Sequence, residues 1–330
     1  MQDIGIIQDF LKKNHLSDAR IEWMSGDASS RRYARVTSGE KSFILMDTPR
    51  SEKPEEFIMI DRLLGKAGLS VPEIYDVNPE KSLLLLEDLG DDTYTRMLEK
   101  GEEQDFLYTL AVDVLLEIAR IRDVEGVALY DQAFVRKMVE AFTDWFMPAA
   151  FGKPTDAAAK KELLGIIDDL FVSIRDVPKG LMWLDYHVDN LMLLKNRKGV
   201  RACGLMDFQD ARVGPLAYDL MSLLEDARRD VPEGLQQRLL AYYLEKSGMD
   251  DKDLFMRSYH VTAVKRHLRV IGVFSRLKMR DGKGKYLKHI PRVWRLLERH
   301  LNLPYMRPLK DWLDANIPQK FRTIPPSLEE

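Results

Sequence analysis

Asp185, Asn190 and Asp207 have the types and spacing of residues that bind a cation. Asp185 lies in a polar loop, Asn190 follows five residues later, and Asp207 stands where an apolar run ends. Two short apolar runs, 191–194 and 203–206, flank a charged turn, and this pattern predicts a β-hairpin. Such a hairpin can hold the two carboxylates and the carboxamide close together on a fixed support.

Oxygen donors of this kind suit a hard cation such as magnesium. Magnesium prefers oxygen ligands, takes few of them from protein, and leaves positions for phosphate oxygens. A carboxylate outside the metal shell can accept the proton of an attacking hydroxyl. A loop Asp, an Asn five residues later and a strand-end Asp follow the order used in kinase phosphoryl transfer. An Asp and an Asn at this spacing also occur by chance, so the prediction depends on further motifs.

The composition describes an ordinary globular protein. The chain has 330 residues, which exceeds the usual size of one domain, so two lobes or domains are expected. Hydrophobic residues make up 45% of the sequence, enough for a sizeable core, and the net charge of −3 gives no reason to expect nucleic acid as a partner. The single cysteine, Cys203, excludes internal disulfides and cysteine-based zinc clusters, and its apolar surroundings predict a buried, inert thiol.

The N-terminal segment predicts an amphipathic helix. Residues 1–14 combine apolar residues with two aspartates and two lysines, which is typical of an amphipathic helix and not of a signal peptide. No run of eighteen apolar residues occurs, so no membrane partner is expected and the cytoplasm is the favoured compartment. Residues 318–330 are expected to form a loose tail. The sequence leaves the oligomeric state open, with a monomer as the favoured state.

The first ninety residues predict a small α+β unit. Strands are predicted at 20–24, 32–37, 41–47, 71–76 and 82–86, and a helix at 52–67. Residues 25–31 between the first two strands are small and polar, which can bring backbone N–H groups close to nucleotide phosphates. An ordinary hairpin turn is the alternative for this segment. Arg31 and Arg32 favour the phosphate interpretation, because guanidinium groups suit phosphate oxygens.

Helices dominate the rest of the chain, from residue 91 onward. Helical spacing of apolar residues predicts helices at 104–121, 131–147, 155–175, 215–230, 232–247, 251–280 and 286–301. The change from strands to helices places a boundary near Gly90, which divides the chain into 1–90 and 91–330.

Together these pieces resemble the aminoglycoside phosphotransferase family of the protein-kinase-like fold. The matching stretches are 26–36, 83–90, 185–190 and 207–220. Within that family, Gly-Asp-Ala-Ser-Ser-Arg-Arg-Tyr, Leu-Glu-Asp-Leu-Gly, Asp-Tyr-His-Val-Asp-Asn-Leu and Asp-Phe-Gln-Asp-Ala are similar to a bacterial subgroup. Its members phosphorylate the anomeric hydroxyl of N-acetylmuramate and N-acetylglucosamine in cell-wall recycling. The resemblance implies a two-lobed α+β fold and transfer of phosphate from ATP, with Mg²⁺, to an alcohol group of a small sugar.

The resemblance also assigns roles to individual residues of the C-terminal lobe, 91–330, which would be mainly helical and hold the acceptor. It makes Asp185 the catalytic base and Asn190 and Asp207 the ligands of magnesium. Asp219 matches a buried aspartate that braces the catalytic loop, which is a structural duty.

In the N-terminal lobe, 1–90, the resemblance implies a nucleotide site on a β-rich sheet. The hinge from Glu87 to Leu89 would hydrogen-bond adenine through its backbone. The residues expected to bind the phosphates are Gly26, Ser29, Arg31 and Arg32.

The chain departs from the family pattern at two places. Trp183 stands where the family has a histidine before the catalytic aspartate, and Leu184 where the subgroup often has an arginine. The orientation of Asp185 is therefore expected to depend on packing. The strand at 41–47 lacks the usual ATP-binding lysine in its apolar part, and Lys41 falls early. Either arginine of the phosphate loop is a candidate replacement.

Four further residues are candidates for contact with the acceptor. His187 is expected to be a hydrogen-bonding loop histidine near the substrate, because no second histidine lies at metal-ligand spacing. Trp145 would stack on a sugar ring, although an aromatic residue in a helix is more often core. The basic segment 265–280 is expected to form a solvated helix face, since its charges alternate with apolar residues. Alternatively, Arg266 and Arg276 face the cleft and bind a substrate carboxylate.

Two other functions remain open at this stage. One is a phosphotransferase for an aminoglycoside or a choline-like alcohol, although the basic segment 265–280 argues against a polycationic acceptor. The other is a nucleotide-binding pseudokinase scaffold, which Trp183 and the missing strand lysine would favour.

Overall fold

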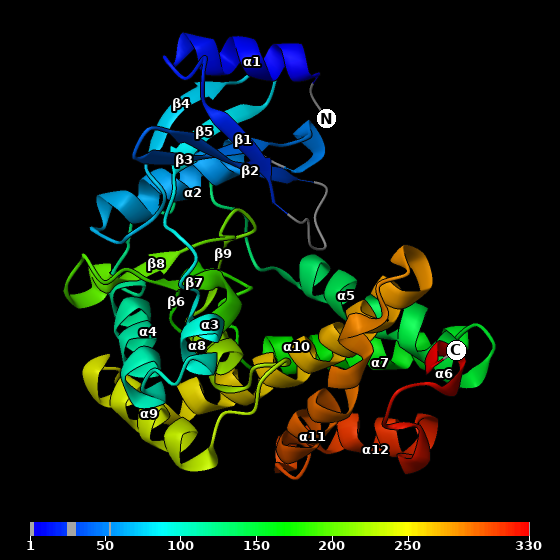
Figure 1. Cartoon of the computed structure of the whole chain (residues 1–330). Helices are drawn as coiled ribbons and strands as arrows, with labels where there is room; N and C mark the ends of the chain where they lie inside the picture. The colour runs from blue at the N-terminus through cyan, green and yellow to red at the C-terminus, as the bar shows by residue number, and fades with distance from the viewer. Residues whose placement is uncertain (1–2, 25–30, 53, 330) are drawn as a thin grey trace. The chain divides into compact units, whose positions relative to one another are not determined.

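A computed structural model of the chain describes residues 3–24, 31–52 and 54–329. The chain forms two compact units. Figure 1 colours the chain by residue number, from blue at the N-terminus to red at the C-terminus. The first consists of Met1–Val124 with Asp185–Ala211, and the second of Glu125–Leu184 with Arg212–Glu330. The catalytic-loop hairpin predicted above therefore belongs to the same unit as the N-terminal sheet. The predicted division into a nucleotide-binding lobe, 1–90, and a catalytic lobe, 91–330, stays a prediction.

The first unit is built on a five-stranded antiparallel sheet with the order β1-β2-β3-β5-β4. Its strands are β1 (Arg20–Trp23), β2 (Arg32–Ser38), β3 (Lys41–Asp47), β4 (Ile74–Asn78) and β5 (Leu83–Glu87). The short helix η1 (Arg50–Glu52) and helix α2 (Pro54–Lys66) connect β3 to β4. All five predicted strands and the predicted helix are confirmed to within a few residues.

Helix α1 (Ile4–Lys13) lies along one face of this sheet (Figure 1). It begins where the carboxylate of Asp3 accepts a hydrogen bond of 2.7 Å from the N–H of Gly5, as an N-cap requires. Its apolar stripe packs on residues of β2, β3 and β5. The cluster includes Ile7, Phe10, Leu11, Val36, Leu45 and Leu85. The amphipathic helix predicted for the N-terminus is therefore confirmed.

The rest of the first unit supports the hairpin of β7 (Leu191–Leu193) and β8 (Cys203–Leu205). The accompanying elements are α3 (Tyr94–Glu99), α4 (Gln104–Ile118), η3 (Val188–Asn190) and η4 (Gly199–Ala202). Ser70 pairs with Gly204 on one edge of the hairpin, and Thr93 pairs with Met192 on the other. The predicted hairpin is thus confirmed. Cys203 within it is fully buried, and burial raises the pKa of its thiol to about 12, which confirms the prediction of an inert thiol.

The second unit is helical apart from one small antiparallel pair, β6 (Lys179–Met182) and β9 (Arg212–Pro215). Its helices are α5 (Gln132–Ala141), the π-helical η2 (Phe142–Phe146), α6 (Met147–Phe151), α7 (Ala157–Val172), α8 (Ala217–Leu224), α9 (Glu233–Lys246), α10 (Lys252–Asp281), η5 (Gly284–His289), α11 (Ile290–His300), η6 (Pro304–Met306), α12 (Arg307–Asn316), η7 (Gln319–Phe321) and α13 (Pro326–Glu329). The 30-residue α10 is central and packs against α5, η2, α8 and α11.

Two expectations about the second unit are wrong. Lys265, Arg266 and His267 are 0%, 3% and 0% exposed, so this part of α10 is no solvated face. The helix is covered on several sides because four other elements pack against it. The C-terminal segment is also packed, since Leu328 is buried and the Ser327 hydroxyl donates a 2.7 Å hydrogen bond to the carbonyl of Ala149.

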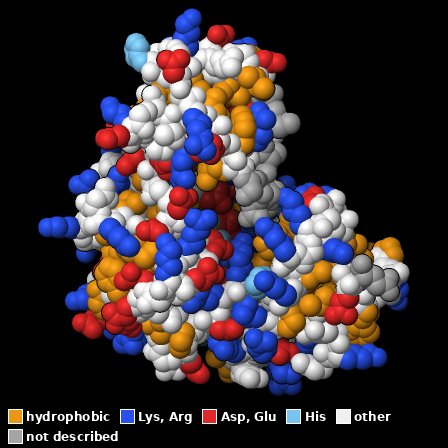
Figure 2. Space-filling view, in the orientation of Figure 1, with side chains coloured by type: hydrophobic (Ala, Val, Ile, Leu, Met, Phe, Trp, Pro, Cys, Tyr) orange, Lys and Arg blue, Asp and Glu red, His pale blue; other side chains and the backbone are white. Residues whose placement is uncertain are grey.

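Across the described ranges, no helix is both long and apolar enough to cross a membrane. Basic and acidic side chains are interspersed over the face shown in Figure 2, in keeping with the small net charge of −3.

Candidate active site

The structure brings Asp185, Asn190 and Asp207 together at one end of the hairpin. Leu191 lies opposite Leu205 in the β7–β8 register, and the N–H of Met206 donates to the carbonyl of Asn190 at 3.1 Å. Asn190 and Asp207 therefore stand at the same end of the hairpin. The side-chain Nδ2 of Asn190 donates to the backbone carbonyl of Asp185 at 2.9 Å, which closes the loop between them.

The electrostatics of this end of the hairpin favour a cation. Although 45% of the Asp207 side-chain surface is exposed, the surrounding protein atoms desolvate its carboxylate and raise its pKa. The negative charge of Asp185 raises that pKa further. Two like charges held this close repel each other, and a divalent ion bound between phosphate and protein oxygens would relieve the repulsion.

The donor set fits magnesium. Because Nδ2 of Asn190 is committed to the Asp185 carbonyl, its amide oxygen is left for a cation. Together with the Asp207 carboxylate this gives two oxygen ligands from protein, and magnesium typically takes one or two carboxylates plus substrate phosphates and water. Phe208 fixes the backbone after Asp207, since its buried ring stacks on Phe57 of α2 at 4.8 Å.

The backbone is strained next to both carboxylates. Leu184, immediately before Asp185, has φ +79°, and Asp207 has φ +61°. A left-handed conformation costs an L-residue roughly 1–2 kcal/mol, and Asp tolerates it better than Leu. Such strain is concentrated at functional sites, where the surrounding structure must hold it. Leucine carries no sequence signal for a positive φ, so this feature could not be predicted.

Asp219 holds the strained backbone from within the second unit. Its buried carboxylate accepts hydrogen bonds from the N–H groups of Trp183 at 2.5 Å and Leu184 at 3.0 Å. This is the bracing role that the resemblance implies. Trp183 itself is 3% exposed, so packing and the Asp219 bonds support the chain before Asp185, where the family has a polar side chain.

Arg31 is the predicted phosphate-binding residue that lies beside the candidate metal site. Its side chain is 7% exposed and forms ion pairs of 3.5 Å with Asp207 and with Glu52. Burial alone would lower the pKa of Arg31, but Tyr33, Asp207 and Glu52 outweigh it, so the pKa is raised and the group stays charged. Glu52 was missed at the sequence level, because nothing in its surroundings marks it as a partner of Arg31.

Arg32 and Lys41 have contacts other than those of Arg31 at the candidate metal site. Arg32 donates from Nε to Asp47 at 3.0 Å and lies over the Trp23 ring at 4.4 Å. Lys41 pairs with Ser38 at the turn between β2 and β3 and is exposed. The other two predicted phosphate-binding residues, Gly26 and Ser29, lie outside the described residues.

The predicted hinge, Glu87 to Leu89, begins at the last residue of β5. The N–H of Glu87 donates to Glu73 at 2.8 Å, and its carboxylate pairs with Arg197. Among the described residues the N–H of Leu89 has no hydrogen-bond partner, as a donor for adenine requires. Asp88 between them is bound by Arg35, whose Nε lies 2.6 Å from its carboxylate.

His187 supports the catalytic loop from inside. It is 4% exposed and caps η3, where its Nδ1 accepts a hydrogen bond of 3.3 Å from the N–H of Asp189. Its Nε2 lies 3.4 Å from Nδ2 of Asn190. The expected hydrogen-bonding loop histidine is present, and its contact with substrate stays a prediction.

The remaining candidates, Trp145, Arg266 and Arg276, belong to the second unit. Trp145 is partly exposed in η2, whereas the next residue, Phe146, is core and stacks on Phe142 at 5.1 Å. Arg266 is buried and donates through Nη1 to the carbonyl of Glu225 at 3.4 Å. No contact among the described residues joins these three side chains into an acceptor site, so that role stays a prediction.

Comparison with known proteins agrees with this geometry. Residues 21–255 match the model of the phosphotransferase enzyme family. The chain is 33% identical to the N-acetylmuramate/N-acetylglucosamine kinase of Caulobacter vibrioides, with 95% of this chain and 96% of the relative covered. It is 36% identical to the enzyme of the same name from Pseudomonas aeruginosa, with 89% and 88% covered. Among solved structures, choline kinase LicA from Streptococcus pneumoniae is similar with a TM-score of 0.65 at 12% identity, covering 91% of this chain and 99% of that one.

The fold and the site therefore define a kinase-like enzyme that phosphorylates a hydroxyl group. The chain belongs to the phosphotransferase enzyme family, in which it resembles the aminoglycoside kinases in fold and the N-acetylmuramate/N-acetylglucosamine kinases in sequence.

Proposed function

We propose that the protein transfers the terminal phosphoryl group of ATP to the anomeric hydroxyl of N-acetylmuramate or N-acetylglucosamine, with Mg²⁺, in the cytoplasm. The reaction would serve cell-wall recycling. The activity named for two relatives that align over most of the chain supports an amino-sugar acceptor. The observation that carries the proposal is the convergence of Asp185, Asn190 and Asp207 at one end of the hairpin.

In this proposal Asp185 accepts the proton of the acceptor hydroxyl as that oxygen attacks phosphorus. Asn190 and Asp207 hold the metal through their oxygens, and a bound magnesium ion would neutralise charge on the nucleotide phosphates. The Asn190–Asp185 hydrogen bond keeps the base at a constant position relative to the metal ligands. Most of the rate enhancement would then come from alignment and charge neutralisation, because phosphoryl transfer needs little covalent help from the protein.

Arg31 takes the place of the missing strand lysine in this proposal. It is buried, charged and paired with the metal-binding Asp207, while Glu52 holds its other edge. A guanidinium group in this position can contact two phosphate oxygens at once, which an ammonium group cannot do with a fixed geometry. Adenine would be bound by the backbone at Leu89.

An acceptor panel tests the proposal. The purified protein is incubated with ATP and Mg²⁺ and with N-acetylmuramate, N-acetylglucosamine, an aminoglycoside or choline, and phosphorus NMR identifies the product. We expect a sugar 1-phosphate from the two amino sugars only. Turnover of the aminoglycoside or choline alone would contradict the assigned acceptor, and absence of any product would favour the scaffold alternative.

The variant Asp185→Asn tests the assigned base. Phosphorylation should fall by about 10²–10⁴-fold, because the acceptor proton loses its base, while binding of ATP measured by calorimetry persists. Asp210→Asn is the matched control, since Asp210 is an exposed carboxylate in the turn after the hairpin. An equal loss of activity in both variants, or an unchanged rate in Asp185→Asn, would remove Asp185 from its role.

A further inference from the structure

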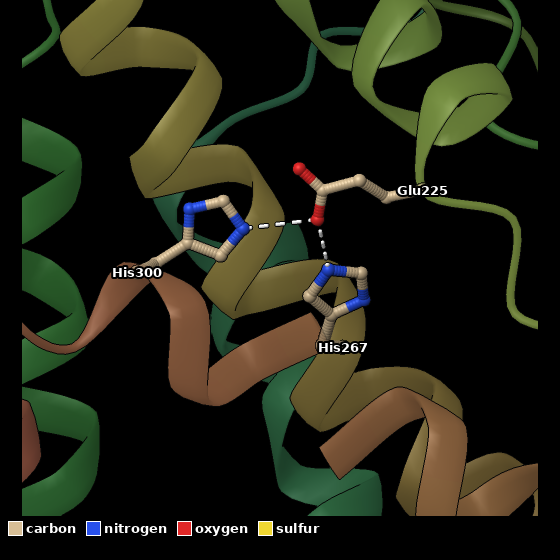
Figure 3. A group of neighbouring side chains, drawn as sticks. All are labelled: Glu225, His267 and His300. Carbon is tan, nitrogen blue, oxygen red and sulfur yellow. Dashed lines mark hydrogen bonds and ion pairs between the residues drawn. The ribbon is translucent and has the colours of Figure 1, made fainter. Parts of the chain in front are cut away.

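Three side chains of the second unit converge on a single buried point. Glu225 caps the end of α8, His267 lies in the middle of α10, and His300 is the last residue of α11. Figure 3 shows the three side chains pointing toward one another from these separate segments. Nε2 of His267 lies 2.8 Å from Oε2 of Glu225, and Nε2 of His300 lies 2.9 Å from the same oxygen.

The carboxylate at this point is buried, and the buried cation Arg266 donates to the backbone carbonyl of Glu225 at 3.4 Å and not to its carboxylate. Glu225 and His300 are each 4% exposed and His267 is fully buried. In the part of the chain that the structure describes, the two imidazoles are the only basic side chains that pair with the Glu225 carboxylate. A buried carboxylate is costly unless it is paired or coordinates a metal ion.

The donor types point to a transition metal. Two imidazole nitrogens and one carboxylate oxygen form a set that binds zinc and similar divalent ions, whereas magnesium and calcium prefer oxygen donors alone. The three donor atoms lie within 4.8 Å of one another. In a tetrahedral zinc site with bonds of 2.0–2.1 Å the donors are about 3.3 Å apart. Forming the metal site would therefore lengthen each Glu225–imidazole distance by about half an ångström and bring the two imidazole nitrogens, which lie within 4.8 Å of each other, to about 3.3 Å.

A further histidine orients one of the proposed ligands. Nδ1 of His260 lies 2.9 Å from Nδ1 of His300, so the ring of His300 is held on the side away from Glu225. Ligating histidines are usually held through their second nitrogen in this manner, which fixes the ring and its tautomer. His260 thus orients Nε2 of His300 toward the cluster.

We propose that Glu225, His267 and His300 bind one zinc ion, with a buried water molecule in the fourth position. The ion cross-links the end of α8 to α10 and α11 and contributes to the stability of the second unit. This site is separate from the magnesium site, whose assigned ligands Asn190 and Asp207 belong to the first unit. The proposal is independent of the acceptor and of the phosphoryl-transfer mechanism.

Metal analysis of the unaltered protein is the first test. The chain is produced without a histidine tag, incubated with Zn²⁺ alone, passed through a desalting column and analysed by mass spectrometry for metal content. We expect about one zinc per chain. Protein that retains no zinc after this treatment, both as purified and after incubation, would overturn the proposal, and this outcome requires no variant to fold.

A matched pair of variants then locates the ion. In the wild type, zinc at about 100 times its Kd should raise Tm by about 5 °C relative to chelated protein. His300→Asn should lose both the retained zinc and the shift. His289→Asn should keep both, since His289 is a half-buried histidine of the same unit outside the cluster. Zinc retained equally by His300→Asn would place it elsewhere and overturn the assignment.

Discussion

In the first unit Asp185 and Asp207 lie close enough for one charge to raise the pKa of the other, whereas in the second unit Glu225 lies between two imidazoles. Burial alone would raise the pKa of Glu225 as well, but His300 and His267 outweigh it and hold that pKa well below its usual value. Asp207 keeps almost half of its side-chain surface exposed, and Glu225 is buried.

The difference separates a site that acts on a ligand from a site that holds the fold. The two carboxylates in the first unit repel each other although Arg31 pairs with one of them, and a bound cation would relieve that repulsion. The cluster in the second unit already has hydrogen bonds from two helices to its carboxylate. Replacing a carboxylate by a carboxamide should therefore have opposite consequences in the two units.

The largest effect is expected for Glu225→Gln. Removing the charge weakens two buried hydrogen bonds from imidazoles to the carboxylate, and a hydrogen bond to a charged group typically contributes about 1.5–3 kcal/mol of unfolding free energy. Urea unfolding of metal-free protein followed by circular dichroism measures the loss. Glu245→Gln, an exposed glutamate on α9, is the control and should change stability by less than about 0.5 kcal/mol. Equal stability of Glu225→Gln and wild type would show that the cluster contributes nothing to the fold.

Unlike Glu225→Gln, the variant Asp207→Asn should lose much of its activity and none of its stability. The asparagine keeps the left-handed conformation but weakens the hold on the metal, and losing one preorganised charge interaction typically lowers kcat by about 10²–10³-fold. Unfolding free energy should stay equal or rise by up to about 1 kcal/mol, because the repulsion from Asp185 disappears. A variant that unfolds more easily than wild type would contradict the comparison.

Local patterns explain how much of the first unit was predictable. The five strands and the hairpin follow from short apolar runs between turns. Asp185, Asn190 and Asp207 all lie in the single stretch 185–207, which contains the hairpin. Their convergence needed no contact between distant parts of the chain. Arg31 was also predicted, but its partner Glu52 was not, since an ion pair across a sheet edge leaves no periodic signal.

Long-range packing explains what was missed. Helical spacing in α10 predicts one polar face, but elements before and after it in the sequence cover that face as well. His267 and His300 reach Glu225 from 42 and 75 residues away, and no local motif relates such positions. Charged residues in a central helix therefore cannot be assigned to solvent from periodicity alone.

A third carboxylate, on α2, differs from both of these because burial is the main influence on its pKa. Asp61 in α2 is 6% exposed, and its Oδ2 has no hydrogen-bond partner among the described residues. Burial raises its pKa from 3.8 to about 7. Since the folded pKa is above the unfolded value, the proton stabilises the fold fully below about pH 4, and this stabilisation is lost as the pH rises through 7.

Asp61→Asn should remove the loss of stability that the wild type shows as the pH rises through 7. At pH 8 the variant should be more stable than wild type by roughly 2–4 kcal/mol, and near pH 4 the two should be nearly equal. Urea unfolding at both values measures the difference, with exposed Asp9→Asn as the control. A constant difference between the two pH values would mean that Asp61 does not titrate in this range.

The smallest expected effect concerns the packing that places His267. Gly272, five residues later on α10, lies so close to the backbone of Ala141 and Phe142 that an added Cβ would overlap both. Gly272→Ala must therefore push α10 away from α5 and η2, and overpacking of this kind typically costs about 1–3 kcal/mol. The same displacement should weaken zinc retention, because α10 carries His267.

Gly165→Ala is the matched control, since a Cβ at Gly165 on α7 meets no atom within 4 Å. Alanine is favoured over glycine inside a helix, so this variant should gain about 0.5–1 kcal/mol and keep its zinc. The two identical substitutions should thus change unfolding free energy in opposite directions. If Gly272→Ala is as stable as Gly165→Ala, the contact between α10 and α5 does not restrain the helix, and the position of His267 must depend on the other elements packed on α10, such as α8 and α11.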